Sequence, residues 1–157
     1  MDRSASTSFH EKLAARLVDV GVPRFNEDHA RLLEIIVAAD RILDAMITPP
    51  VPDGVQQDRD RQWQDLDGLI ARLADYTQSH FMAEESLMKQ YGYPDLEPHR
   101  LEHQELVAQL LAFQQRIQDR SPAPAGKMRR WLLEWLLHHV NRLDAAYGVF
   151  FKEINVV

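Results

Sequence analysis

The sequence contains no cysteine and little glycine, and each shortage narrows what the protein can be. Without cysteine, the chain forms no disulfide, no thiolate zinc or iron–sulfur site and no cysteine nucleophile. Any bound metal ion must therefore be held by imidazole or carboxylate groups. Only 6 of the 157 residues are glycine, and the chain is rich in alanine, leucine, arginine, glutamate and glutamine, which favours helices.

The chain also lacks an excess of basic residues and any long apolar run. Its formal net charge is −6, and its basic residues are interleaved with acids, which argues against nucleic-acid binding. No stretch approaches the roughly 18 consecutive apolar residues of a membrane span, and the first residues, MDRSASTSFHEKLAARL, do not resemble a secretory signal. We therefore expect a cytoplasmic protein with no nucleic-acid partner and no membrane partner.

Four long segments have the spacing of amphipathic helices. We expect helices at about residues 27–46, 61–90, 96–118 and 127–154. TPPVPDG and the polar run after it predict a loop over residues 48–60, while YGYP and DRSPAPAG close the second and third helices. Helices of this length joined by modest loops predict an all-α fold, an up-down-up-down antiparallel four-helix bundle.

We expect a single domain over residues 1–157, with an N-terminal arm at 1–24 and the bundle at 25–155. In the arm, SFHE at 8–11 resembles a capping box, and Gly21 ends a short amphipathic segment. Asn26 and Asp95 are the expected caps of the first and third helices of the bundle.

Two pairs of metal-binding residue types lie on helix faces that the leucines mark as buried. Side chains four apart project from the same face of a helix. His80 with Glu84, and His99 with His103, therefore each form a two-ligand clamp. Two clamps on consecutive helices can meet across the core of a bundle.

The first and fourth helices add one imidazole each, from His29 and His139 on their apolar stripes. Asp144 follows His139 by five residues, so a regular helix with about 100° per residue would turn it away from the shared face. If Asp144 belongs to the site, we expect a local π-type widening between Leu137 and Asp144.

Five histidines and two carboxylates are too many donors for one tetrahedral zinc ion. They suit two adjacent ions that share bridging carboxylates, with iron favoured among the redox metals. A ferritin-like site would use Glu-x-x-His pairs, and the chain has none. The alternative is a set of ordinary hydrogen-bonded core histidines, but five buried imidazoles without partners would cost on the order of a kcal/mol or more each.

The remaining histidines and two nearby acids are expected to lie outside the site, either within the arm or facing a neighbour or solvent. These are His10, His138, Glu85 and Glu102. Four apolar or aromatic residues are expected first to fill the core and second to line a ligand pocket. These are Phe81, Trp135, Leu136 and Tyr147.

Four stretches of the chain resemble the motifs of the hemerythrin family. They are GVPRFNEDHARLL (21–33), HFMAEESLM (80–88), YPDLEPHRLEH (93–103) and WLLHHVNRLDAAY (135–147). Together they span nearly the whole chain, and the single-domain bacterial branch, the bacteriohemerythrins, is the most similar.

The resemblance implies a non-haem di-iron centre that also carries a bridging oxo or hydroxo group. His99, His103 and His139 would hold one iron, His29 and His80 would hold the other, and Glu84 and Asp144 would bridge them. In the family, the iron with two histidines keeps an open position for dioxygen. Phe81, Trp135, Leu136 and Tyr147 match positions that wall this pocket, where an apolar shell slows water access and autoxidation.

Two departures from the family pattern stand out. Asn26 replaces the usual acidic residue before the first ligand, which points to altered support of the His29 side of the site. The 48–60 connection is longer than usual, which points to a lid or a partner surface.

The resemblance implies reversible oxygen binding for storage, delivery or sensing. It does not imply an enzyme, because no group is left over as a general acid or base. Three alternatives stay open at this point. The chain is the oxygen- or redox-sensing domain of a longer signalling protein with an output domain or partner protein, or the centre performs peroxide, nitric oxide or iron-repair chemistry, or the bundle holds no metal.

Overall fold

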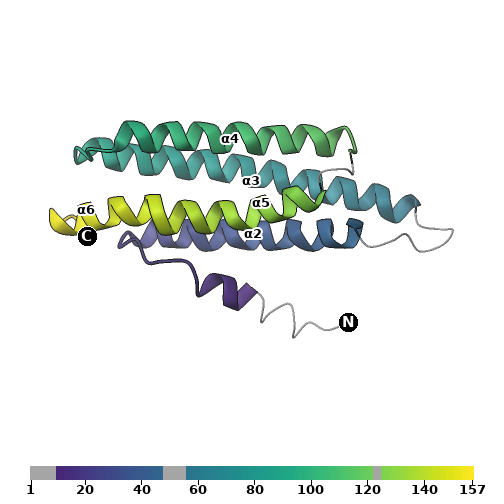
Figure 1. The fold of residues 1–157 in the computed structure, drawn as a ribbon, viewed down its shortest axis with the longest axis horizontal. Helices are drawn as coiled ribbons and strands as arrows, with labels where there is room; N and C mark the ends of the chain where they lie inside the picture. The colour runs from purple at the N-terminus through teal and green to yellow at the C-terminus, as the bar shows by residue number, and fades with distance from the viewer. Residues whose placement is uncertain (1–9, 48–55, 122–124) are drawn as a thin grey trace.

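A computed structural model describes residues 10–47, 56–121 and 125–157, in which the regular secondary structure is helical and there is no strand. The elements are α2 (Pro23–Ile47), α3 (Gln56–Gln90), α4 (Leu96–Gln118), α5 (Ala125–His138), the π-helix η1 (His139–Asp144) and α6 (Ala145–Glu153). Figure 1 shows four long antiparallel rods, the fourth made of α5, η1 and α6 in succession. The predicted all-α helical bundle is confirmed.

The bundle is held by close packing of neighbouring rods around an apolar core. α2 packs against α3 and α5, and α3 packs against α4, whereas α4 and α5 approach each other less closely. The periodic apolar residues of every rod are buried, for example Leu32, Ile36, Leu73, Leu110 and Leu132. No helix in the described part of the chain is long and apolar enough to cross a lipid bilayer.

A glycine with a positive φ forms the turn between α3 and α4. Gly92 has φ +68°, a conformation that costs glycine little, and the N–H of Tyr93 donates to the carbonyl of Met88 at 2.9 Å. This contact ends α3 at the predicted place. Asp95 precedes α4 as predicted, although its side chain makes no capping hydrogen bond.

Two predicted helix starts are wrong. α2 begins at Pro23, because proline suits the first turn of a helix, and Asn26 therefore lies inside the helix and does not cap it. The Asn26 side chain accepts from the N–H of Val20 at 3.0 Å and donates to Asp19 at 2.7 Å. α3 begins at Gln56, so the last five residues of the predicted 48–60 loop are helical; its other residues fall outside the described ranges.

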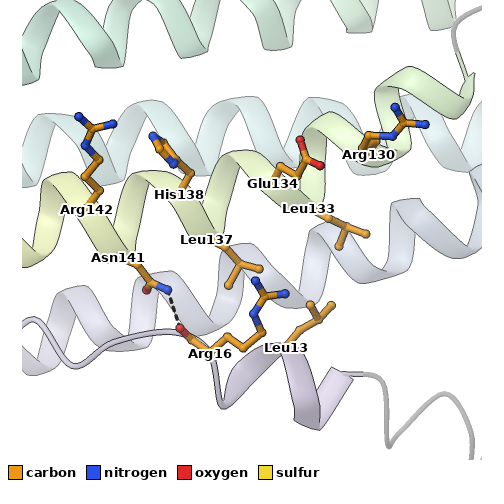
Figure 2. Close-up of a pocket in the computed structure, with 9 residues that line it drawn as sticks. All are labelled: Leu13, Arg16, Arg130, Leu133, Glu134, Leu137, His138, Asn141 and Arg142. Atoms are coloured by element: carbon orange, nitrogen blue, oxygen red, sulfur yellow. Dashed lines mark hydrogen bonds between the residues drawn. The ribbon is translucent and has the colours of Figure 1, made fainter.

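The described part of the N-terminal arm lies along α5 and η1 (Figures 1 and 2). The first two residues of the predicted capping box at 8–11 lie outside the described ranges. Leu13 and Val20 are buried, and a groove of about 730 Å³ separates the arm from α5. Asn141 of η1 fixes the arm, because its side chain accepts from the N–H of Val18 at 3.0 Å and donates to the carbonyl of Arg16 at 2.7 Å.

Candidate metal centre

All seven of the predicted ligand residues come together inside the bundle, and each side chain belongs to a residue no more than 3% exposed. α2 supplies one, and α3, α4 and η1 supply two each. They are His29, His80, Glu84, His99, His103, His139 and Asp144.

The seven side chains form two overlapping groups that can each hold a metal ion. In each group one nitrogen or oxygen atom per residue lies within 4.8 Å of all the others. One group has three imidazoles, from His99, His103 and His139, and the other has two, from His29 and His80. Glu84 and Asp144 belong to both groups. The arrangement is therefore that of two adjacent sites with two shared carboxylates.

Glu84 divides its two oxygens between the groups. Its Oε1 lies 2.7 Å from Nε2 of His80, in the two-imidazole group. Its Oε2 lies 3.2 Å from Nε2 of His103, in the three-imidazole group. The Tyr147 hydroxyl donates to Oε1 at 2.8 Å and fixes the carboxylate in this orientation.

Asp144 spans the groups in the same way, and the π-helix makes this possible. Oδ2 lies 3.0 Å from Nε2 of His29, while Oδ1 lies 3.1 Å from Nε2 of both His99 and His139. In η1 each backbone bond reaches five residues along, so His139 and Asp144 project from the same side. The predicted local widening of the fourth helix is confirmed.

His80 is oriented by a hydrogen-bonded chain from α2 and α3. Its Nδ1 donates to Oδ2 of Asp28 at 2.8 Å, and Oδ1 of Asp28 accepts from the Tyr76 hydroxyl at 2.7 Å. A carboxylate of this kind sets the tautomer of the imidazole and turns Nε2 toward the centre. The two-imidazole side thus has an acidic partner in Asp28, whereas Asn26, where the family usually has an acid, binds Asp19 of the arm.

His103 has a comparable partner, which corrects a prediction. Its Nδ1 donates to Oε1 of Glu85 at 2.8 Å, and Glu85 also pairs with Arg100 at 3.3 Å. Glu85 is therefore not simply an outward-facing charge. The ring of Phe81 stacks on the His103 imidazole at 3.6 Å between centroids, which fixes the ring from a second side.

In the metal-free chain, contacts between the imidazoles and the carboxylates keep these buried groups charged. Burial lowers the pKa of His80, but Glu84 and Asp28 outweigh it and raise that pKa to about 10. The pKa of His99 is raised to about 9, since Asp144 and Glu84 outweigh its burial. Burial raises the pKa of both carboxylates, yet the surrounding imidazoles hold that of Glu84 well below its usual range and that of Asp144 at about 2.

Several buried atoms of the cluster make no hydrogen bond with any described residue, although they lie close together. They are Nε2 of His80 and His99, Oε2 of Glu84 and both carboxylate oxygens of Asp144. Leaving such atoms unsatisfied is costly, so their gathering indicates a missing electrophilic partner. Imidazole nitrogens and carboxylate oxygens suit divalent transition metals such as iron. The donor set therefore fits a pair of metal ions.

The four predicted pocket-lining residues are all buried, and Tyr147 does more than pack. Its hydroxyl bond to Glu84 was missed from the sequence because it joins residues 63 positions apart. Phe81 covers His103, and Trp135 shares a cavity with His139. Leu136 is a buried core residue. Their role as a pocket wall for a ligand stays a prediction.

Comparisons with known proteins agree with this geometry. The family model described as the hemerythrin HHE cation binding domain matches residues 20–148, most of the chain. The chain belongs to the hemerythrin family. The resemblance predicted from the four motifs is thus confirmed. The name of the family model also refers to cation binding, which agrees with the cluster of imidazoles and carboxylates.

Individual relatives carry the same family name. A bacteriohemerythrin of Stenotrophomonas maltophilia is 25% identical over 131 residues, which cover 83% of this chain and 75% of that protein. One of Methylococcus capsulatus is 32% identical over 83 residues, covering 53% of this chain and 60% of that protein. The myohemerythrin of Sipunculus nudus is 27% identical over 78 residues, covering 50% and 59%.

Proposed function

We propose that this hemerythrin-family protein is a non-haem di-iron protein that binds dioxygen reversibly. His99, His103 and His139 would hold one iron and His29 and His80 the other, while Glu84 and Asp144, which belong to both groups, would serve both ions. The observation that carries the proposal is the division of oxygens in both carboxylates between the two groups of imidazoles. A site for one metal ion would not require two carboxylates that each reach both groups of imidazoles.

When bound in these sites, two ferrous ions would supply the electrons for reversible oxygen binding. The protein residues hold and shield the ions. Asp28 and Glu85 fix the imidazoles of His80 and His103 from outside, and Tyr147 keeps a proton on its hydroxyl against Glu84, since burial raises its pKa. The buried rings of Phe81 and Trp135 limit access of water.

We infer binding without substrate turnover. Each described carboxylate or imidazole that contacts the cluster is either a candidate ligand or the hydrogen-bond partner of one. None of them is therefore left to exchange protons with a substrate.

One observation favours a sensing role as a second candidate. Asn141 lies between the candidate ligands His139 and Asp144 in η1, and its side chain holds two backbone groups of the N-terminal arm. A shift of η1 on oxygen binding would reach the arm through this residue. In that case, oxygen would change the protease sensitivity of the arm.

The test is to measure iron per chain and the visible spectrum of the reduced, desalted protein before and after exposure to air. We expect two irons and a pink oxygenated form that fades under argon and returns in air. His139→Gln should lose iron, whereas His138→Gln, which changes the exposed neighbouring imidazole, should keep both irons. Absence of iron after anaerobic reconstitution of the native chain would refute the proposal.

A further inference from the structure

A cavity of about 280 Å³ lies between α4 and α5 and extends inward to the candidate metal centre. Glu102 and Glu105 line it from α4, Glu134, Trp135 and His138 from α5, and His139 from η1. These two rods approach each other less closely than the other neighbouring rods that pack together. We name this cavity the α4–α5 cleft.

The outer part of the cleft is negatively charged. Glu105 and Glu134 are exposed and Glu102 is half-buried, and none of the three forms an ion pair with a described residue. No lysine or arginine is among the described residues that line the cleft. Figure 2 shows the side chains of Glu134 and His138 on the side of α5 that faces away from the arm. Both residues also line the groove beside the arm, together with Arg130 and Arg142.

The inner part of the cleft ends at a candidate ligand. His139 is 3% exposed and Trp135 is 6% exposed, and both line the cleft. Nδ1 of His139 and Nε1 of Trp135 are buried and make no hydrogen bond with any described residue, so both atoms have unused capacity to bind a polar group that enters the cleft. Nε2 of the same imidazole lies 3.1 Å from Oδ1 of Asp144. One ring therefore separates the cleft from the cluster.

We propose that the α4–α5 cleft is the route by which ferrous ions reach the centre, with Glu102, Glu105 and Glu134 attracting them at its mouth. This inference rests on the proposed di-iron function. Clefts lined by one sign of charge raise the local concentration and the association rate of an oppositely charged ion. The three carboxylates belong to neither described group of atoms close enough to hold an ion, so they guide the ion without retaining it.

Another cavity near the two-imidazole side is less suited to a cation. It has a volume of about 500 Å³ and contains Phe25, whose ring packs against His80 at 5.6 Å between centroids. Its described lining includes the guanidinium of Arg24 and no carboxylate. The charge of this cavity repels a ferrous ion, whereas that of the α4–α5 cleft attracts one.

The test compares rates of ferrous ion uptake by the intact metal-free chain without oxygen, followed by stopped-flow tryptophan fluorescence. The variant carries Glu102→Gln, Glu105→Gln and Glu134→Gln. The control carries Glu11→Gln, Asp65→Asn and Glu153→Gln, three exposed positions outside the cleft with the same change in net charge. At low ionic strength we expect uptake by the cleft variant to be roughly tenfold slower than by the control.

Final iron content should be equal in the two variants, and the difference in rate should shrink at about 0.5 M salt, where charges are screened. Equal rates with full loading would overturn the route and leave the proposed function intact. A native chain that binds no iron would overturn both. Should the triple variant fold poorly, Glu134→Lys alone, at an exposed helix position, is expected to slow uptake in the same salt-dependent way.

Discussion

Glu84 is the residue on which both candidate sites depend, because its two oxygens face different groups of imidazoles. His29 belongs to only one of the two groups. Glu84→Ala should therefore lose both irons or leave one weakly bound, whereas His29→Ala should lose mainly the iron of the two-imidazole group. Iron per chain after gel filtration measures this, with circular dichroism to verify folding. Two irons retained in both variants would contradict the assignment.

Glu85 acts on the centre through His103 and offers a test of positioning. Removal of such an outer partner typically weakens metal affinity about 10–100-fold. We expect Glu85→Ala to show a loss of this size in competition with an iron chelator. Glu97→Ala is the matched control, since Glu97 is an exposed acid that also pairs with Arg100. Equal affinities would show that Phe81 stacking alone orients His103.

The sequence predicted residues that share a helix face better than contacts between helices. His80 with Glu84 and His99 with His103 followed from four-residue spacing. The bonds from Asp28 to His80 and from Tyr147 to Glu84 join different helices, and spacing along one helix carries no information about them. The role of Glu85 was missed for the same reason.

At the scale of elements, the π-helix is the feature that the sequence predicted best, because the five-residue interval from His139 to Asp144 is incompatible with one face of a regular helix. Helix starts were predicted less well. The true start of α2 depends on Pro23 and on the hydrogen bonds of Asn26 to the arm, which are contacts across a turn. Local apolar periodicity does not report such contacts.

Docking of the arm on the fourth rod requires a glycine in α6. A Cβ added at Gly148 would lie 2.5 Å from the carbonyl oxygen of Val20, so Gly148→Ala must displace the arm. We expect this variant to lower the free energy of unfolding by about 1–3 kcal/mol. The measurement is chemical denaturation, with limited proteolysis to detect release of the arm.

Gly68→Ala is the control for this variant. Gly68 also lies within a helix, and a Cβ there would meet nothing within 4 Å. Since alanine favours helices over glycine, we expect a gain of roughly 0.5–1 kcal/mol. A similar gain for Gly148→Ala would show that the arm does not press on α6.

For the whole molecule, the bundle was predictable because four long amphipathic segments have few other ways to bury their apolar faces. The looser packing between α4 and α5, and hence the cleft, was not. The distance between these two rods depends on how all four rods pack together, and the apolar pattern of a single helix does not specify it. The −6 net charge gave no hint that three carboxylates gather at this seam.

The buried charges make the stability of the metal-free protein depend on pH. The pKa values of His80 and His99 are about 10 and about 9, above the roughly 6.5 of an unfolded histidine. A raised pKa contributes stability that is complete below pH 6.5 and is lost as pH rises toward 10. The low pKa of Asp144, about 2, adds stability that disappears only in strong acid. Stability should therefore fall across the alkaline range.

The iron-loaded protein should behave in the opposite way. Metal binding requires deprotonated imidazole at Nε2, so protons compete with iron and loading weakens as pH falls. Alkaline pH removes no proton from an imidazole that already binds metal there, so the loaded protein should keep its stability toward pH 10. Denaturant midpoints of both forms between pH 6 and 10 test this. Parallel curves would mean that the imidazoles are not the residues that exchange protons for iron.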